Sequence, residues 1–347
     1  MRVLLTGATG FVGGHTMAAL LDAGHDVVAF VRSEDKLAKM LDLHGLAADA
    51  VTSATGDITN RASVDEAIAG CDAAIHTAAA VIFDPARLHE MEEVNLAGAR
   101  AVLGAAVDAG CDPIIHFSSI AALFPCPNDM MRSTDDVPNG TTPYAKSKQG
   151  CERHARSLQD DGHPVTIIYP GSIIGPLDVG GHVVGGGIVG GLGLGYIPIP
   201  SKGGTPYIDV RDLAAGTVAA LEPGLGPRRF MAGGQYVSWQ DNAALMDNAS
   251  GMDWKKKNIP AAVLETMGRA GDLVAKVRKG WAPPLSHEQA ISMTRAVPTD
   301  DEAFTTELGV DYRDLQTSLT ETFEWLVRSG QMPPEMAPQF AELAPRD

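Results

Sequence analysis

The sequence has few cysteines, and none of them is spaced as a metal ligand or redox pair. Its four cysteines, Cys71, Cys111, Cys126 and Cys151, are scattered and form no Cys-x-x-Cys pair, which indicates neither a zinc site nor a disulfide framework. No apolar run reaches the roughly 18 residues that a membrane span needs. Met1 leads directly into an apolar run, so we expect no signal peptide. These absences predict a soluble cytoplasmic protein.

The chain also lacks an excess of positive charge. It carries 27 Lys and Arg against 43 Asp and Glu, a net charge of −16. Nucleic acids and anionic membranes attract basic surfaces, so we expect neither as a general partner. A phosphorylated cofactor needs only local cations and is compatible with this balance. The 347 residues, 45% of them hydrophobic, are enough for one large domain or two smaller ones with a real core.

A glycine turn near the start is the most informative motif. Residues 5–13 read Leu-Thr-Gly-Ala-Thr-Gly-Phe-Val-Gly, directly after an apolar run. We expect Gly7 to turn the backbone, Gly10 to let a pyrophosphate approach the peptide N–H groups, and Gly13 to let a helix lie close to the strand. The spacing is G-x-x-G-x-x-G rather than the general G-x-G-x-x-G. The pattern favours a dinucleotide at a helix N-terminus over a glycine turn without a ligand.

Two further motifs follow in order. Ser118-Ser119 comes after the apolar run 113–117, and Tyr144-Ala-Lys-Ser-Lys148 begins 25 residues after Ser119. Together with the glycine turn, these motifs resemble the extended short-chain dehydrogenase/reductase family, the NAD(P)-dependent epimerase/dehydratase group. The resemblance is strongest over residues 1–176 and recurs at Tyr207–Asp212 and near the C-terminus.

Strand-like and helix-like segments alternate in the first half. Strands are predicted at 2–6, 26–31, 51–55, 73–76, 113–118 and 165–169, and helices at 11–23, 34–43, 60–69, 85–109 and 143–160. The alternation predicts an α/β Rossmann fold with a doubly wound parallel sheet. We expect a dinucleotide-binding domain over 1–176, rejoined by 207–232. A smaller, mainly helical substrate-binding region would comprise 177–206 and 233–347, with an amphipathic helix around Leu315–Leu326.

The glycine-rich stretch 180–195 has two interpretations of equal weight. It is either a mobile loop, or a segment that covers the substrate and orders on binding.

The end of the second predicted strand favours NADP over NAD. An acidic residue there would accept hydrogen bonds from the ribose 2′-OH, but the sequence has Arg32, with Lys36 nearby. Both cations suit a 2′-phosphate. The alternatives are that Arg32 faces solvent or stacks on the adenine, and the nearby Glu34 and Asp35 weaken the preference.

The resemblance implies further cofactor contacts. Asp57 matches the position that binds the adenine amino group, with a helix N-cap as its competing role. The turn 77–80 would pack on the ribose, His76 being a packed strand histidine. The 169–176 element would border the nicotinamide, with Tyr169 in place of the common arginine. The predicted cofactor residues are Gly7, Thr9, Gly10, Phe11, Val12, Gly13, Arg32, Lys36, Asp57, Ile58, Thr77, Ala78, Ala79, Tyr144, Lys148, Pro170, Ser172 and Ile173.

The predicted catalytic set is Ser119, Tyr144, Lys148 and Asn95. Tyr144 and Lys148 are four residues apart and share a helix face, and an ammonium one turn away stabilises a phenolate. By resemblance, Tyr144 protonates the carbonyl oxygen, Ser119 orients it, and Asn95 supports the network. Ser118 is the alternative serine, but the 25-residue spacing favours Ser119.

We therefore expect an NADP(H)-dependent oxidoreductase of a ketone or aldehyde, closest to the dihydroflavonol reductase and 3β-hydroxysteroid dehydrogenase branch. Ser119 and the apolar residues Val81, Phe83, Leu123 and Phe124 would bind a largely apolar substrate, and no metal is expected. The main alternative is an NAD-dependent nucleotide-sugar epimerase or dehydratase, although Ile120-Ala121 lacks the acidic pair that marks a dehydratase. A cofactor-sensing protein without catalysis is a third hypothesis, and a homodimer is common in the family.

Overall fold

A seven-stranded parallel sheet forms the centre of the N-terminal half. The computed structural model describes residues 1–80, 88–140, 142–180, 195–278 and 285–345. The sheet order is β10-β6-β5-β4-β1-β2-β3, and every neighbouring pair is parallel. Its strands are β1 Arg2–Thr6, β2 Asp26–Val31, β3 Thr52–Thr55, β4 Ala73–His76, β5 Ile114–Phe117, β6 Val165–Pro170 and β10 Arg228–Ala232. The predicted doubly wound Rossmann sheet is confirmed.

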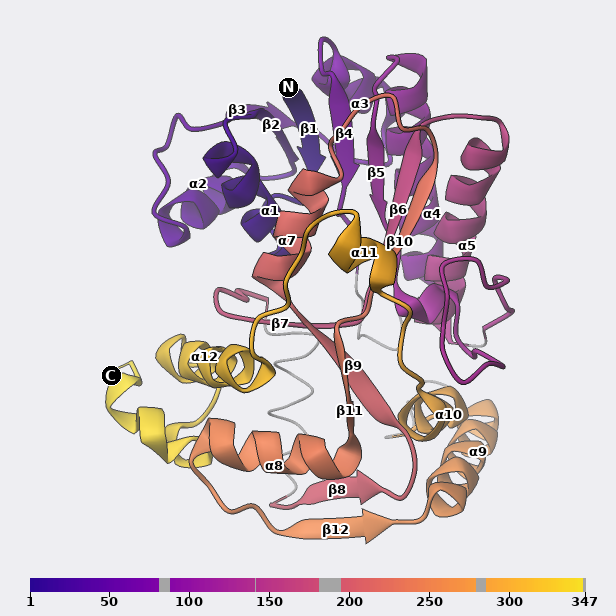
Figure 1. Ribbon diagram of the computed structural model, residues 1–347, viewed down its shortest axis with the longest axis vertical. Helices are drawn as coiled ribbons and strands as arrows, with labels where there is room; N and C mark the ends of the chain where they lie inside the picture. Colours follow the sequence, from indigo (N-terminus) through magenta and orange to yellow (C-terminus); the bar gives the residue numbers. More distant parts are fainter. Residues whose placement is uncertain (81–87, 141, 181–194, 279–284, 346–347) are drawn as a thin grey trace.

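Helices cover both faces of this sheet (Figure 1). One face carries α1 Phe11–Asp22, α2 Glu34–Leu43, α7 Val210–Ala219 and α11 Glu302–Thr306, which share one hydrophobic core. The other carries α3 Arg61–Ile68, α4 Leu88–Asp108 and α5 Pro143–Asp160, which share a second core. Because β1 is buried between the two layers, Val3, Leu4 and Leu5 form an unbroken apolar run. The helix expected at 85–109 corresponds to α4, and 81–87 lies outside the described residues.

The remaining elements form a second region below the carboxyl ends of the strands in Figure 1. It contains a three-stranded sheet, β11-β9-β7, and a two-stranded sheet, β12-β8. The strands are β7 Ser172–Ile174, β8 Ile197–Pro200, β9 Gly204–Asp209, β11 Gln235–Ser238 and β12 Lys256–Ile259. The helices are α8 Trp239–Ser250, α9 Ala261–Val277, α10 His287–Arg295 and α12 Leu315–Arg328, with 3₁₀ turns at Pro334–Met336 and Pro338–Leu343. A further 3₁₀ turn, Ile120–Ala122, follows β5 of the large sheet and packs on α5.

The chain passes between the two regions more than once. Segment 207–232 is divided: β9 belongs to the three-stranded sheet, whereas α7 packs on α1 and β10 pairs with β6. The predicted amphipathic helix is confirmed as α12, whose Leu319 and Phe323 are fully buried against α8. Among the described residues, no helix is both long enough and apolar enough to span a bilayer.

Candidate cofactor and active site

The turn between β1 and α1 has the geometry expected of a dinucleotide cradle. Gly7 has a φ of +83°, and a Cβ there would lie 2.4 Å from Thr77 Oγ1. A Cβ on Gly13 would lie 2.0 Å from the Gly7 carbonyl oxygen, so α1 could not approach the turn with any side chain there. Gly10 differs, because the nearest atom to its added Cβ is the Gly7 oxygen at 3.3 Å. Space is therefore left beside Gly10, where an approaching phosphate needs it.

The first turn of α1 has no side chain to satisfy its N–H groups. Its N-cap is Gly10, which offers no side-chain hydrogen bond, and no acidic residue lies in that turn. Such a helix N-terminus favours an anion. The neighbouring end of β4 is held in place by Thr77, whose Oγ1 donates to the Thr6 carbonyl at 2.8 Å. These features fit the pyrophosphate of a dinucleotide.

His76 is a packed strand histidine, as the sequence indicates. Its Nδ1 lies 2.8 Å from Thr6 Oγ1, and its ring stacks on that of His116. Burial, with the nearby Lys148 charge, lowers the pKa of His76 to about 3. The ring is therefore neutral near pH 7, so it is unsuited to proton transfer there.

The carboxyl ends of β2 and β3 bring the predicted adenosine contacts together. Arg32 lies exposed just after β2. The pKa of Asp57 is lowered mainly by two hydrogen bonds from Thr59, and to a smaller extent by the charge of Arg32. Those bonds, from the Thr59 N–H and hydroxyl to Asp57 Oδ1, measure 2.8 and 2.7 Å. The alternative role of Asp57 as a helix cap is wrong, because α3 is capped by Asn60. Sequence spacing alone could not separate these two caps.

Glu34, the acid that weakens the NADP preference, is held toward β3. Its Oε1 accepts hydrogen bonds from Ser53 Oγ at 3.1 Å and Thr55 Oγ1 at 3.2 Å. Lys36 is exposed on the first turn of α2. Glu34 is thus directed to the hydroxyls of β3, while Arg32 and Lys36 are exposed.

Three of the catalytic candidates, Ser119, Tyr144 and Lys148, lie just after β5 and on α5, which packs against the turn after β5. Thr142 caps α5 and Pro143 begins it, which places Tyr144 and Lys148 on its first two turns, both half-buried. Lys148 Nζ donates to the Phe117 carbonyl at 3.4 Å. Ser119 follows Phe117 by two residues, and its Oγ accepts from the Ala121 N–H at 3.1 Å. This bond leaves the Ser119 hydroxyl proton available to another acceptor.

Ser118 is engaged elsewhere. Its Oγ donates to Glu152 Oε2 at 2.6 Å inside the protein, which turns the hydroxyl away from the surface. Asn95, on α4, pairs with the peptide of Ala80: Oδ1 accepts from Ala80 N at 2.6 Å, and Nδ2 donates to Ala80 O at 2.9 Å. Nδ2 also donates to Ser147 Oγ at 2.8 Å, so Asn95 joins the turn after β4 to α5.

Glu152 is a buried carboxylate beside Ser118 that the sequence motifs did not indicate. Glu152 is 0% exposed and accepts hydrogen bonds of 2.6 Å from Ser118, from the Tyr169 hydroxyl and from Arg156 Nε. Burial and the Glu152 charge raise the pKa of Tyr169 far above its usual range. Arg156 Nη2 also donates to the Tyr169 hydroxyl at 3.3 Å, so Tyr169, Glu152 and Arg156 form one connected cluster. The available signal was spacing, since Glu152 lies four residues after Lys148 on one helix face.

The predicted substrate residues differ in burial, and two of them are not described by the structure. Phe124 is half-buried, and its carbonyl accepts from Gln149 Nε2 at 3.3 Å. Leu123 is buried in the core beside α5, whereas Val81 and Phe83 lie outside the described residues. The start of α5 is also tied to α10: the N–H and hydroxyl of Thr142 each donate to a Glu288 carboxylate oxygen at 2.6 Å.

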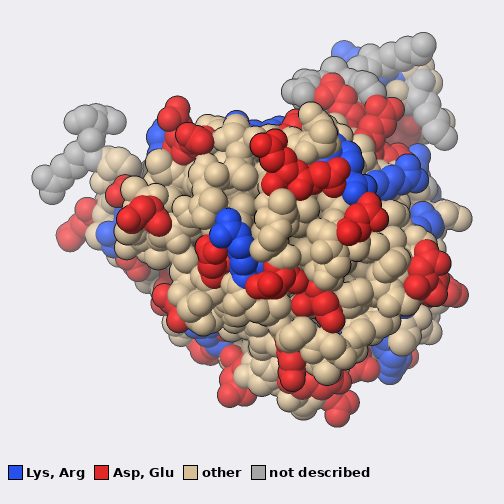
Figure 2. All heavy atoms as spheres, turned by 90° about the horizontal axis from the view of Figure 1, so that it is seen from above, with Lys and Arg blue, Asp and Glu red and all other residues tan. Residues whose placement is uncertain are grey.

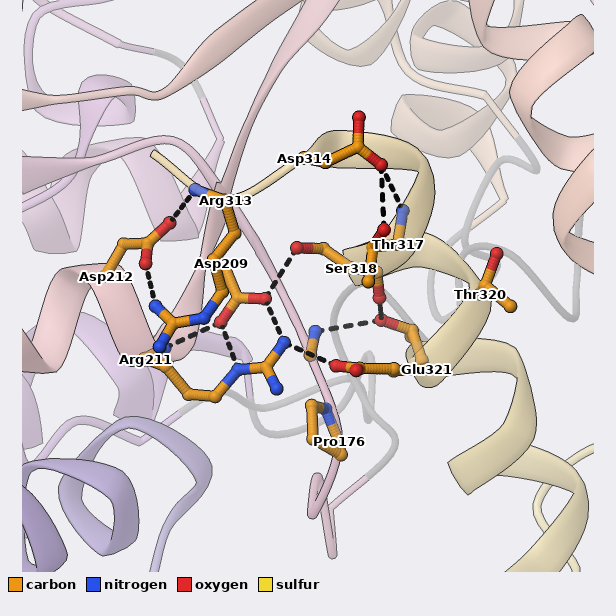
Figure 3. Close-up of polar contacts among 12 residues, drawn as sticks. Pro176, Asp209, Arg211, Asp212, Arg313, Asp314, Thr317, Ser318, Thr320 and Glu321 are labelled. Carbon is orange, nitrogen blue, oxygen red and sulfur yellow. Dashed lines mark hydrogen bonds and ion pairs between the residues drawn. The ribbon is translucent and has the colours of Figure 1, made fainter. Parts of the chain in front are cut away.

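The 169–176 and 207–212 elements lie beyond the end of β6. Pro170 ends β6, Ser172 and Ile173 begin β7, and Ser172 Oγ lies 3.0 Å from Thr205 Oγ1 of β9. Figure 3 shows that Arg211 bridges Asp209 and Glu321, while Asp212 pairs with Arg313. Ser318 also donates to Asp209 at 2.6 Å. These contacts join β9 and α7 to α12, so the charged residues of the 207–212 element have structural partners.

Comparison with known proteins relates most of this chain to one family. The model of the NAD dependent epimerase/dehydratase family matches residues 3–233. The sterol demethylase protein B of Methylococcus capsulatus is 26% identical over 96% of this chain and 100% of its own length. A putative dihydroflavonol 4-reductase of Synechocystis is 25% identical over 94% of both chains. The dTDP-glucose 4,6-dehydratase DesIV of Streptomyces venezuelae, solved with NAD bound, superimposes with a TM-score of 0.72 at 21% identity, covering 96% of this chain and 99% of that one.

Proposed function

From the premise that this chain belongs to the NAD dependent epimerase/dehydratase family and is an NAD(P)-dependent oxidoreductase, we propose that it uses NADPH to reduce a ketone or aldehyde on a largely apolar small molecule, or catalyses the reverse oxidation. The observation that supports the proposal is that α5 packs on the turn that Ser119 caps, with Lys148 donating to the Phe117 carbonyl two residues before Ser119. An uncapped glycine turn that could hold the cofactor begins α1 of the same sheet layer.

The residues of this chain divide the chemistry between them. When bound, the nicotinamide cofactor supplies the hydride. Tyr144 gives its phenolic proton to the carbonyl oxygen as charge develops there. The Ser119 hydroxyl donates a hydrogen bond to the same carbonyl oxygen. Its proton is free to do so because Ser119 Oγ only accepts in its bond with the Ala121 N–H. Lys148, fixed by the Phe117 carbonyl, stabilises the phenolate that results.

The preference for NADPH rests on the adenosine end of the cradle. Arg32 is exposed beside Asp57, and Lys36 is exposed on the first turn of α2. Glu34 is occupied by two hydroxyls of β3, which reduces its ability to accept hydrogen bonds from a ribose. A guanidinium in this position can bind a 2′-phosphate through two parallel hydrogen bonds.

The first experiment is native mass spectrometry of the purified protein with NADPH and with NADH. An empty protein that takes up NADPH in preference supports the proposal, and hydrophobic ketones and aldehydes are then screened for NADPH oxidation. Tightly held NAD that resists exchange would instead support the nucleotide-sugar epimerase or dehydratase alternative.

The catalytic assignment is tested separately. Tyr144→Phe should abolish turnover while leaving the affinity for NADPH unchanged, because only the phenolic proton is removed. Full activity in this variant would show that Tyr144 is not the proton donor.

A further inference from the structure

One helix of the second region exposes an apolar face. Of the eight large hydrophobic residues that are exposed in the described part of the chain, five lie on α9. Their exposed fractions range from 45% to 83%, and they are Val263, Met267, Leu273, Val274 and Val277. At 100° per residue all five fall on one side of the helix, together with Ala262, Thr266 and Ala270. That side carries no charged residue.

The other side of α9 packs against the protein. Leu264 is buried, and a Cβ on Gly268 would lie 2.7 Å from the Cα of His287 on α10. The helix therefore has a first side that faces α10 and a second, apolar side that faces solvent. Burial of the second side would be favourable by the hydrophobic effect, so its exposure in a protein with an ordinary core calls for a partner.

The segment around α9 is basic although the chain is acidic. Residues 255–279 contain seven of the 27 Lys and Arg and only two of the 43 Asp and Glu, a local charge of +5. Arg269 and Arg278 of this segment are both exposed. The opposite end of the molecule differs: Figure 2 shows Asp and Glu spread across that face, with Lys and Arg in smaller groups. The net charge of −16 thus hides an uneven distribution.

We propose that the exposed apolar side of α9 binds the surface of an anionic phospholipid bilayer. A helix with one uncharged apolar side and flanking Arg and Lys lies parallel to a membrane interface, with its apolar side among the acyl chains and its cations at the headgroups. Figure 1 places α9 and β12 together at the end of the molecule furthest from the N-terminus, so this end can approach a flat surface.

The docking surface is closely connected to the catalytic helix. Helix α9 packs on α10, and Glu288 of α10 accepts both hydrogen bonds from Thr142, two residues before Tyr144. Binding at the membrane would therefore hold the start of α5 near the bilayer, where apolar substrates concentrate. A second copy of this chain suits the surface less well, because a symmetric contact through α9 would bring its cations against one another.

The test is co-sedimentation with lipid vesicles. The full chain should bind vesicles of mixed phosphatidylcholine and phosphatidylglycerol more tightly than phosphatidylcholine alone, and less tightly as salt increases. Val277→Glu should lower binding by about tenfold or more, because it places a carboxylate at the most exposed residue of the apolar side. Arg278→Gln should lower binding by about fivefold on the mixed vesicles only.

Leu225→Glu is the matched control, since Leu225 is also an exposed apolar residue but lies outside α9. It should leave binding unchanged. NADPH binding is measured on every variant as a check of folding. Because it does not depend on the vesicle result, failure of the membrane proposal is distinguishable from failure of the proposed reductase activity. Absence of binding to either vesicle, an equal loss in Leu225→Glu, or a wild-type dimer that Val277→Glu dissociates would overturn the proposal. The last result would assign this face to contact between copies.

Discussion

Replacing Glu152 by glutamine removes the charge at the centre of the buried cluster behind Ser119. The substitution keeps the shape of the side chain but leaves the Arg156 guanidinium, whose side chain is 15% exposed, without its ion-pair partner. In the wild type, two hydroxyls and the guanidinium donate to the Glu152 carboxylate. In the variant, the glutamine N–H₂ is itself a donor and cannot accept these hydrogen bonds. Removing one member of a buried ion pair costs about 3–5 kcal/mol. We expect the free energy of unfolding to fall by that amount in urea denaturation.

The same substitution should lower turnover more than cofactor affinity. Glu152 connects β5 through Ser118 and β6 through Tyr169 to the helix that carries Tyr144 and Lys148. Loosening this connection displaces the catalytic groups relative to one another, and a displacement of this kind lowers kcat by about 10- to 100-fold. The glycine cradle is not touched, so the affinity for NADPH should be unchanged.

Two companion variants make the reasoning refutable. Tyr169→Phe removes one neutral donor and leaves the ion pair, so it should cost only about 1 kcal/mol. Combining Glu152→Gln with Arg156→Gln should cost less than the two single substitutions added together, because the double variant has no unpaired charge. A Glu152→Gln protein as stable as the wild type, or strict additivity in the double variant, would show that the cluster is not coupled as the structure indicates.

Three further predictions concern the cradle and the pH dependence. Arg32→Ala should weaken NADPH binding by about tenfold or more while leaving NADH binding nearly unchanged, in titrations with both cofactors, because one phosphate contact is lost. Gly10→Ala should fold normally yet bind NADPH poorly, whereas Gly13→Ala should lower the free energy of unfolding by several kcal/mol. The added Cβ of Gly10 would lie 3.3 Å from the Gly7 oxygen, but that of Gly13 would lie only 2.0 Å from it. Equal stability of the two variants would contradict this. Burial lowers the pKa of His15 in the folded protein to about 4, from 6.5 in the unfolded chain. Below pH 6.5 the unfolded chain therefore binds this proton more readily than the folded protein, and the free energy of unfolding falls as the pH drops. His15→Gln should lose about 2 kcal/mol less than the wild type between pH 6.5 and 5, in urea denaturation at each pH.

Several features of the fold follow from short stretches of sequence. The alternation of apolar runs and amphipathic segments predicted the strands and helices of the parallel layer to within a few residues. The reason is that the spacing of apolar residues within each element follows the pattern of its buried positions. The glycine turn after β1 is equally local, since its positive φ at Gly7 and its close contacts arise within a few residues or at one neighbouring strand end. The spacing of Tyr144 and Lys148 placed both on one side of α5 for the same reason.

Other features needed the folded chain. The position of Glu34 depends on Ser53 and Thr55 in the adjacent strand. The choice between Ser118 and Ser119 depends on Glu152, 34 residues further along the chain. The bond from Asn95 to Ala80, the division of segment 207–232 between two sheets, and the apolar side of α9 that remains uncovered all depend on which elements pack together.

The physical reason for this division is the range of the interactions. Periodicity, turn geometry and capping act between residues a few positions apart, so the sequence by itself determined the Rossmann sheet, the glycine turn after β1 and the placing of Tyr144 and Lys148 on α5. Buried carboxylates, ion-pair partners and exposed apolar faces are defined by atoms brought together from distant positions. Only the tertiary structure decided that Arg156 pairs with Glu152 beside Tyr169, and that one side of α9 faces solvent.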